Sequence, residues 1–246
     1  MFKEGDWVLI RYEERRYLRK LQPKSSINVG ADVLRFSQIV GKPPGTRIGK
    51  FEVFYPTLEE IIVLGFERKT QIVYPKDAFF IAFKLGLDRS KRVLEFGTGS
   101  GALCAVLSSL AGEVYTYEIE ERFYKLATKN LKKFGLGDNV KFHREDFLQA
   151  DVSREFFDSA FVDLKDPVPY IDKLHASLRD GATVGFLLPT ANQVVDLLRS
   201  LRDKFGGVEV LEILVRNYKT IAERFRPQDT MVGHTAYLLF CRKLTA

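Results

Sequence analysis

The chain has 246 residues, 46% of them hydrophobic, and a formal net charge of +6 at pH 7. This length allows one large domain, or a small one and a medium one, with a sizeable core. The basic balance suits a polyanionic partner. Without a leader pattern or a long apolar run, the sequence gives no support to secretion or a membrane helix, and we expect a cytoplasmic protein with no membrane partner.

Cysteine and histidine give no sign of a disulfide framework or a metal site. Cys104 and Cys241 stand alone in apolar segments, and neither belongs to a C-x-x-C pair. The histidines, His143, His175 and His234, do not cluster with cysteines at the spacing of zinc ligands. We therefore expect reduced thiols and no metal.

Residues 1–67 are predicted to form a small β-barrel or β-sandwich domain ahead of a larger domain, 68–246. Segments 6–12 and 15–21 predict a hairpin, and 28–33 predicts another hairpin turn. The first hairpin mixes tyrosines with basic residues, a composition typical of nucleic-acid surfaces. Its basic residues are Arg11, Arg15, Arg16, Arg19, Lys20 and Lys24. Taken alone, the stretch favours the alternative of an exposed edge hairpin protected by charge.

Two helices are predicted between this β region and the next strand. Thr57–Glu60 has the pattern of a capping box and begins a short helix that ends near Leu64. Pro75 suits the first turn of a helix that continues to Leu85. Thr70, Gln71, Tyr74 and Asp77, the polar residues ahead of this second helix and in its first turn, can be caps or surface.

A strand, a glycine turn and a helix follow from Arg92 onward. Segment 92–96 predicts a buried strand, Gly97, Gly99 and Gly101 form the turn, and 102–110 predicts a helix packed on a sheet. This arrangement lets a ligand approach bare backbone at a helix N-terminus. Three glycines in five residues weaken a turn that gains nothing from them, which disfavours a purely structural turn.

Two acidic residues narrow the ligand class. Gly97, Gly99 and Ala102 also satisfy the dinucleotide fingerprint, so a nicotinamide or flavin enzyme is a rival. Glu95 would repel a pyrophosphate but suits an ammonium group. Glu118 ends the next apolar run, 21 residues after Gly97, where an acid meets a ribose diol. The pattern E-x-G-x-G-x-G with this second acid resembles the Class I S-adenosylmethionine-dependent methyltransferases.

From residue 88 onward, strands and helices alternate. The expected strands are 92–96, 114–117, 140–143, 158–163, 183–188, 208–218 and 235–242. The expected helices are 102–110, 120–134, 167–178 and 191–205. Because no helix separates the last two strands, that pair is predicted to be antiparallel. The fold class is α/β, a Rossmann-like methyltransferase fold with a seven-stranded, mostly parallel sheet and an antiparallel final strand.

Four acids fall at or just beyond predicted strand ends, where ligands bind in such sheets: Glu95, Glu118, Asp146 and Asp163. Glu118 suits the ribose hydroxyls. Asp146 suits the adenine amino group, although it can instead cap a helix that begins at Phe147. Asp163 ends its strand where a transferred methyl group would point, and a half-buried carboxylate there is more often functional than structural.

Four segments together resemble a narrower family. They are Thr70–Asp77 (TQIVYPKD), Glu95–Gly101 (EFGTGSG), Asp163–Pro167 (DLKDP) and Val232–Ala236 (VGHTA). In this order they look like the bacterial and archaeal homo-oligomeric tRNA (adenine-N1)-methyltransferases that modify adenine 58 in the T-loop. The resemblance covers nearly the whole chain. Lys165 and Val168 depart from it, since many relatives have Pro and Trp there, and this departure concerns the shape of the target-base pocket.

The resemblance implies S-adenosylmethionine as cofactor, tRNA as substrate and a homotetramer. It places Asp163 closest to the target base, with Tyr74 in the same pocket. The residues expected at the cofactor are Gln71, Glu95, Gly97, Thr98, Gly99, Ser100, Gly101, Glu118, Asp146 and Asp163. Those expected at the RNA or the base are Tyr74, His234, Arg15, Arg16 and Arg19. For His234, a satisfied residue at a strand start is an equal alternative.

Three rival functions stay open from the sequence. A Class I methyltransferase acting on a small molecule or a protein, such as isoaspartyl residues, shares the glycine loop but has no need of a basic β domain. A non-catalytic RNA-binding subunit is disfavoured because the glycine loop and its acids are intact. A nicotinamide oxidoreductase is disfavoured by Glu95 and by the antiparallel end of the sheet.

Overall fold

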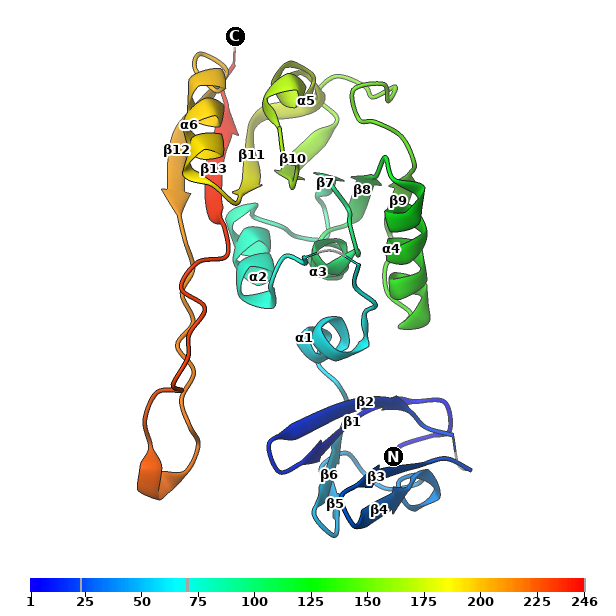
Figure 1. The fold of residues 1–246 in the computed structure, drawn as a ribbon. Coiled ribbons are helices and arrows are strands. Elements are labelled where there is room, and N and C mark those ends of the chain that lie inside the picture. The colour runs from blue at the N-terminus through cyan, green and yellow to red at the C-terminus, as the bar shows by residue number, and fades with distance from the viewer. Residues whose placement is uncertain (23, 70, 246) are drawn as a thin grey trace. The chain divides into compact units, whose positions relative to one another are not determined.

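The computed structural model describes residues 1–22, 24–69 and 71–245 (Figure 1). The chain folds as two compact units, Met1–Glu67 and Arg68–Ala246. The first unit is built mainly from short strands, and the second alternates strands with helices. The mixture agrees with the predicted α/β class preceded by a small β domain.

The described residues of the first unit form a four-stranded antiparallel sheet and a separate two-stranded one. The larger sheet has the order β2-β1-β6-β5, and the smaller pairs β3 with β4. Their bounds are β1 Trp7–Tyr12, β2 Arg15–Lys20, β3 Ser26–Val29, β4 Asp32–Arg35, β5 Thr46–Ile48 and β6 Phe51–Phe54, with a 3₁₀ turn, η1, at Phe36–Gln38. In the β1–β2 hairpin, Tyr12 pairs with Arg15, so the predicted hairpin has a two-residue turn in which Glu13 takes a positive φ of 54°.

The capping box at Thr57 forms as predicted. The Thr57 hydroxyl accepts a hydrogen bond from the Glu60 backbone N–H at 3.3 Å, and the Glu60 carboxylate accepts one from the Thr57 N–H at 2.9 Å. It begins α1, Leu58–Glu60, which continues as one π-helical turn, η2, over Ile61–Gly65.

The second unit contains a seven-stranded sheet within its described residues. The strands are β7 Arg92–Phe96, β8 Glu113–Tyr117, β9 Val140–His143, β10 Phe157–Val162, β11 Leu178–Leu188, β12 Phe205–Leu211 and β13 Tyr237–Lys243. The helices are α2 Pro75–Lys84, α3 Ala102–Leu110, α4 Glu121–Lys133, α5 Ile171–Ser177 and α6 Ala191–Ser200, with 3₁₀ turns η3 at Val168–Tyr170 and η4 at Ala222–Arg224.

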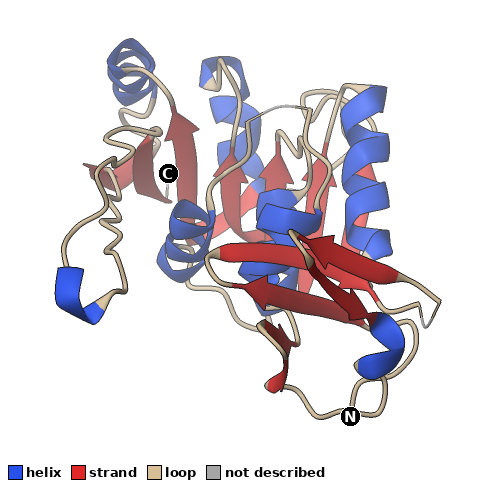
Figure 2. Ribbon diagram, turned by 60° about the horizontal axis from the view of Figure 1, so that its bottom comes forward, coloured by secondary structure: helices blue, strands red, loops and turns tan. Residues whose placement is uncertain are grey.

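The strand order of this sheet is β12-β13-β11-β10-β7-β8-β9, with helices flanking it (Figure 2). Neighbours from β11 to β9 are parallel, whereas β13 runs antiparallel to both β11 and β12. The mostly parallel sheet with an antiparallel final strand is therefore confirmed. Because of this order, the carboxyl ends of β7, β8, β10 and β11 and the start of β13 share one edge.

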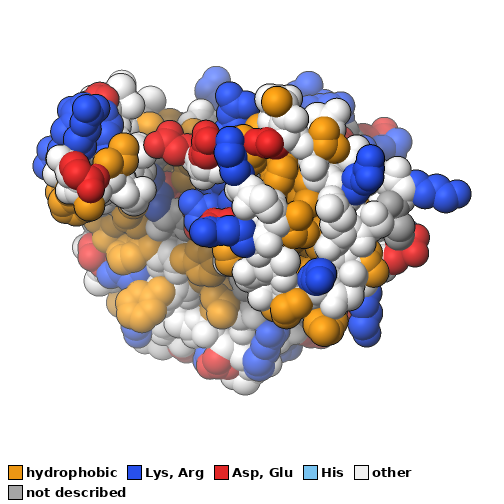
Figure 3. Space-filling model, turned by 90° about the horizontal axis from the view of Figure 1, so that it is seen from below, with side chains coloured by type: hydrophobic (Ala, Val, Ile, Leu, Met, Phe, Trp, Pro, Cys, Tyr) orange, Lys and Arg blue, Asp and Glu red, His pale blue; other side chains and the backbone are white. Residues whose placement is uncertain are grey.

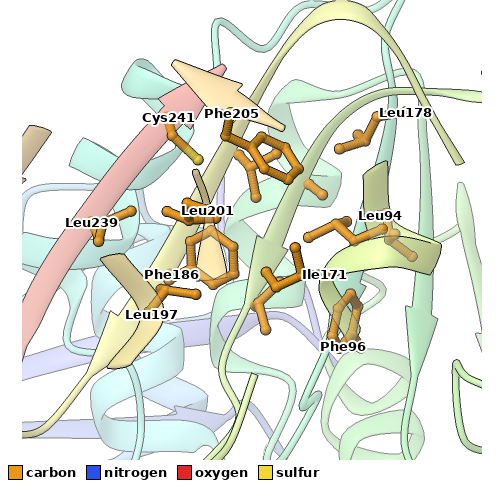
Figure 4. Packing of buried hydrophobic residues seen from close by; sticks show 14 of the residues in the cluster. Leu94, Phe96, Ile171, Leu178, Phe186, Leu197, Leu201, Phe205, Leu239 and Cys241 are labelled. Carbon is orange, nitrogen blue, oxygen red and sulfur yellow. The ribbon is translucent and has the colours of Figure 1, made fainter. Parts of the chain in front are cut away.

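The main core lies in this second unit and is rich in aromatic and branched side chains (Figure 4). Phe96, Phe157 and Phe186 are fully buried among aliphatic residues from β10, β11, α5 and α6. The helices α3, α4 and α6 pack on β8, β9 and β11 respectively. Such packing holds the strand ends rigidly, which a site built from strand-end residues requires.

Two predicted elements differ from the structure. The predicted helix 167–178 is shorter, since η3 precedes α5, and residue 178 already belongs to β11. The predicted strand 208–218 ends at Leu211. Beyond it, residues 212–236, here called the arm, leave the sheet as an outgoing and a returning segment. The two segments lie side by side and are joined at the Tyr218–Pro227 bridge (Figure 1). The arm lacks regular strand structure because few ladder hydrogen bonds connect its two segments.

No helix in the described ranges is long and apolar enough to span a membrane. The same residues contain no cluster of three His, Cys, Asp or Glu side chains suited to a metal ion. Cys104 and Cys241 are free thiols, and both are buried.

Candidate active site

A cavity of about 360 Å³ opens at the shared edge formed by the carboxyl ends of β7, β8, β10 and β11. It gathers many residues that the sequence predicts for the site. Those in its walls are Gln71, Tyr74, Glu95, Gly97, Thr98, Gly99, Ser100, Glu118 and Asp163. Segments far apart in the sequence contribute to it, because Thr235 and Ala236 line it as well.

Gly97 allows the ends of two neighbouring strands to meet beneath the cavity. Its φ is +94°, and a Cβ placed there would lie 2.0 Å from the backbone carbonyl oxygen of Asp163. The Asp163 N–H also donates to the Phe96 carbonyl at 3.0 Å. Any side chain at residue 97 would push β7 away from β10, so this glycine brings Asp163 to the glycine loop.

Gly101 has a different role at the start of α3. Its φ is +80°, and a Cβ would come within 2.7 Å of Leu131 on α4. Gly101 is not among the residues that line the cavity in the described structure. Its absence of a side chain therefore serves the packing of α3 against α4, which sets the loop's path.

Asn130 holds the same loop from below, and the sequence analysis missed it. Its side chain is fully buried on α4 and donates from Nδ2 to the Ser100 carbonyl at 2.9 Å. An amide on the apolar face of an amphipathic helix indicates a buried, hydrogen-bonded side chain, but it does not indicate which segment that side chain binds.

Glu95 is buried at 1% exposure and is bound by a hydroxyl that the sequence analysis also missed. The Thr116 hydroxyl donates to Glu95 Oε2 at 2.6 Å, and the Thr98 hydroxyl lies 2.5 Å from that of Thr116. Burial raises the pKa of Glu95 to about 7, and the negative charges of Asp163 and Glu118 act in the same direction.

Glu118 faces the glycine loop from the end of β8. Its carboxylate accepts hydrogen bonds from the backbone N–H groups of Gly99 and Glu120, each at 2.9 Å. Each carboxylate oxygen has a second lone pair, so Glu118 keeps the capacity to accept from two hydroxyl groups.

Asp163 reaches the cavity half-buried, and its carboxylate has no hydrogen-bond or ion-pair partner among the described residues. Burial raises the pKa of Asp163 to about 7, with a further contribution from the charge of Glu118. An unpaired carboxyl in a cavity is available to a ligand, which sets Asp163 apart from Glu95 and Glu118.

Asp146 lies in a smaller hollow of about 40 Å³ that adjoins the cavity through Gly97, Glu118 and Leu164. Its Oδ1 accepts from the Leu148 N–H at 2.9 Å, but residues 147–149 form a turn, so the alternative of a cap for a helix beginning at Phe147 is wrong. Phe96, Phe147 and Tyr170 form aromatic walls, with Phe96 stacked on Phe147 at 4.9 Å between ring centroids. The hollow therefore combines a flat apolar surface with a hydrogen-bond acceptor.

Tyr74 is the N-cap of α2 and exposes part of its side chain at the cavity wall. Asp77, which the sequence presents as a cap or a surface residue, is instead buried, lines the same wall and pairs with Lys76. Thr70 lies outside the described residues.

His234 does not line the cavity, although its neighbour Thr235 does. Its Nδ1 lies 2.5 Å from the Glu212 carboxylate and its Nε2 3.0 Å from the Pro189 carbonyl oxygen. The hydrogen bond to Glu212 raises the pKa of His234 above its usual value. With both ring nitrogens engaged, the geometry favours the alternative of a satisfied residue at a strand start.

Arg15, Arg16 and Arg19 lie on β2, an edge strand of the first unit, with exposed side chains. The Arg19 guanidinium lies 5.6 Å from the ring centroid of Tyr17. They belong to the N-terminal unit and so form no part of the cavity walls.

Residues 50–226 match the family described as the tRNA methyltransferase complex GCD14 subunit. The chain belongs to this family. The match begins within the first unit and extends through most of the second. It includes every described cavity-lining residue from Gln71 to Pro189, but not Thr235 and Ala236.

Known relatives agree with that membership. A crystal structure of tRNA (m1A58) methyltransferase TrmI from Aquifex aeolicus is 63% identical, with a TM-score of 0.96, and covers 100% of this chain and 99% of its own. TrmI, the tRNA (adenine(58)-N(1))-methyltransferase of Thermus thermophilus, is 32% identical over 206 residues, which are 82% of this chain and 80% of that protein. A solved SAM-dependent O-methyltransferase from Thermotoga maritima is 37% identical, with a TM-score of 0.91, covering 100% of this chain and 95% of its own.

Proposed function

We propose that the protein transfers a methyl group from S-adenosylmethionine to N1 of adenine 58 in the T-loop of tRNA. The observation that carries this proposal is the unpaired Asp163 carboxylate beside the glycine loop, in a chain of the tRNA methyltransferase family. The high identity to TrmI over the whole chain supports the same substrate.

The residues present fit the cofactor. Gly97 and Gly99 leave bare backbone in the cavity wall ahead of α3. Glu118 suits the ribose hydroxyls, and the hollow at Asp146 suits an adenine ring with its amino group. Glu95 suits the ammonium group of the amino acid, directly or through water. When bound, the cofactor supplies a methyl group on a sulfonium cation.

Asp163 has the chemistry that the acceptor requires. Adenine N1 carries a lone pair, so no strong base is needed to remove a proton before attack. The ionised Asp163 accepts a hydrogen bond from the exocyclic amine, which raises electron density at N1 and stabilises the cationic product ring. Tyr74, across the cavity wall, stacks on or hydrogen-bonds to a base drawn out of its stack. Alignment of N1 with the methyl group supplies much of the remaining acceleration.

Replacement of Asp163 by Ala tests this function. We expect turnover to fall about a hundredfold or more, because the hydrogen bond to the developing charge is lost. The affinity for S-adenosylmethionine, measured by calorimetry, should change much less. Turnover is measured as 1-methyladenosine formed in tRNA after digestion to nucleosides. Equal losses of turnover and affinity, or no loss of either, would remove Asp163 from the target-base site.

The β1–β2 hairpin is proposed as a tRNA-binding surface. Arg15, Arg16 and Arg19 are exposed on its edge strand and free of carboxylate partners among the described residues, and Tyr17 adds an aromatic ring. Basic side chains interleaved with aromatics favour RNA backbone and base contacts. Figure 3 shows the Lys and Arg side chains on the face seen from below, some of them gathered in groups and others set apart by apolar and uncharged surface.

A homotetramer is proposed on the basis of the arm. Its described side chains include a series of exposed large apolar residues, which a monomer would leave in water. They are Leu214, Val215, Tyr218, Ile221, Phe225, Met231 and Val232. The edge strand β12, which leads into the arm, adds Val208 and Val210. A second copy of the chain would cover these side chains and pair the free edge of β12.

A cytoplasmic location accords with the two buried, free thiols and with a tRNA substrate. The alternative acceptor, a small molecule or a protein, is less favoured, because the basic hairpin would then have no role. The Thermotoga maritima relative carries a description as an O-methyltransferase, so the acceptor is the feature that experiment must decide.

A further inference from the structure

Lys76 belongs to the first turn of α2 and faces the root of the arm. The root is here the part of the arm next to β12 and β13, which includes Ile213 and Thr235. Its Nζ donates to both carboxylate oxygens of Asp77, at 2.8 and 2.9 Å, to the carbonyl of Ile213 at 2.8 Å and to the hydroxyl of Thr235 at 2.9 Å. The Lys76 side chain is 17% exposed and that of Asp77 only 4%. All the protons of the ammonium group are therefore engaged within the protein.

These contacts connect the arm to the cavity wall. Ile213 lies on the outgoing segment of the arm and Thr235 on the returning segment, so Lys76 is bound to both segments. The Thr235 hydroxyl also lies 3.3 Å from Asp77 Oδ2, and both Thr235 and Asp77 line the cavity. The backbone N–H of Asp77 donates in turn to the Tyr74 carbonyl at 2.9 Å. A continuous chain of hydrogen bonds thus leads from the arm root to Tyr74.

We propose that Lys76 is a positioning residue that fixes the Tyr74 and Thr235 walls of the cavity at the separation that the target adenine requires. This inference rests on the proposed function. The ammonium group of Lys76 already donates all its hydrogen bonds within the protein and is largely buried, so it is unsuited to bind an RNA phosphate. It acts through Tyr74 and Thr235, and a shift of about 1 Å in such a wall is enough to lower turnover about a hundredfold.

A structural role in docking α2 is separable from this positioning role. The other end of α2 carries Lys84, whose Nζ pairs with Glu209 on β12 and lies 5.9 and 5.7 Å from the ring centroids of Phe80 and Phe240. Both lysines connect α2 with the β12 side of the sheet, but Lys84 does not line the cavity or contact a residue that does so among those described. Lys84 is therefore a matched control for Lys76.

The test compares Thr235→Val, Thr235→Ser, Lys76→Met and Lys84→Met in the full-length protein. Thr235→Val keeps the shape and removes one acceptor of Lys76 and one donor to Asp77, whereas Thr235→Ser keeps the hydroxyl. Each variant is measured for single-turnover methyl transfer to an unmodified tRNA transcript, for S-adenosylmethionine affinity by calorimetry and for thermal midpoint.

We expect the methyl-transfer rate of Thr235→Val to fall about tenfold and that of Lys76→Met by more, with cofactor affinity within about twofold of the unmodified protein. Thr235→Ser should recover most of the rate, and Lys84→Met should keep it within about twofold even where its thermal midpoint falls. A Thr235→Val protein as fast as the unmodified one, or equal losses in Thr235→Val and Thr235→Ser, would overturn the proposal. If the unmodified protein itself leaves tRNA unmethylated, the proposed function fails instead.

Discussion

At the scale of single residues, the cavity concentrates negative charge that a cationic cofactor can compensate. Burial raises the pKa of Glu95 and that of Asp163 to about 7 in the structure without ligand. A sulfonium and an ammonium group favour the ionised carboxyls, so binding lowers both pKa values. The stability of the protein without cofactor also depends on these two groups. Because their pKa values are higher in the folded than in the unfolded state, they lower the free energy of unfolding as pH rises from about 4 to about 7.

The resulting prediction concerns protons released on binding. Near pH 7, S-adenosylmethionine binding should release on the order of one proton, and affinity should rise between about pH 6 and pH 8. Calorimetry at pH 7 in buffers with different ionisation enthalpies measures the release directly. Glu95→Gln should remove the protons that Glu95 releases on binding and leave those that Asp163 releases. A binding heat that is the same in every buffer would contradict this account of the cavity.

The rule that ligands bind at the carboxyl ends of parallel strands predicted several site residues. Other site residues lie in the interior of helices and strands and were not predicted. Glu95, Glu118 and Asp163 could be placed because a carboxylate after an apolar run marks the ligand edge of a parallel sheet. Thr116 and Asn130 could not, because each lies within an element and acts only on a segment brought close by the fold. Their roles as positioning residues for Glu95 and the glycine loop depend on tertiary contacts that no local pattern encodes.

At the scale of elements, the β1–β2 hairpin should govern affinity for tRNA. Phosphate contacts release counterions, so binding should weaken steeply with salt. Replacement of Arg15, Arg16 and Arg19 together by Gln should lower the slope of log affinity against log salt by about three. Filter binding or fluorescence anisotropy between low and moderate salt measures the slope, with Arg199→Gln on α6 as the control. A slope unchanged by the triple variant would remove the hairpin from the RNA surface.

The arm should govern assembly. Phe225 is 70% exposed and Val232 lies on the returning segment of the arm, also exposed. Charges at both, in Phe225→Asp with Val232→Asp, should convert a tetramer into smaller species, because each charge would be buried on association. Sedimentation velocity measures the mass against the 28.2 kDa chain. Phe83→Asp is the control, since Phe83 is 79% exposed on α2, outside the arm. A monomeric unmodified protein at micromolar concentration would contradict the proposed assembly.

The arm also marks the limit of element prediction. Segment 208–218 has the apolar alternation of a strand, and the first residues do form β12. The remainder has the same local preferences but leaves the sheet, where the neighbouring strand no longer provides a full ladder. Strand patterns record a side chain's fit to a sheet surface, so they cannot show where the sheet stops.

At the scale of the whole molecule, the order of elements along the chain determined the architecture. Alternating strands and helices predicted a parallel sheet, and the helix-free final pair predicted the antiparallel β13, as the strand pairings confirm. The sheet then brings residues 71–74, 77, 95, 97–100, 118, 163 and 235–236 to one cavity. The exact closure of that cavity by the arm root was not predictable, because the hydrogen bond from Lys76 to the Ile213 carbonyl joins residues 137 positions apart.

The most direct test of the account is methyl transfer from labelled S-adenosylmethionine to an unmodified tRNA transcript, beside a transcript in which adenine 58 is replaced. The account predicts label in the first transcript and none in the second, with 1-methyladenosine as the labelled nucleoside. Label in both transcripts would contradict the assigned target. Label in neither, with cofactor binding confirmed by calorimetry, would contradict the tRNA substrate itself and favour a small molecule or a protein as the acceptor.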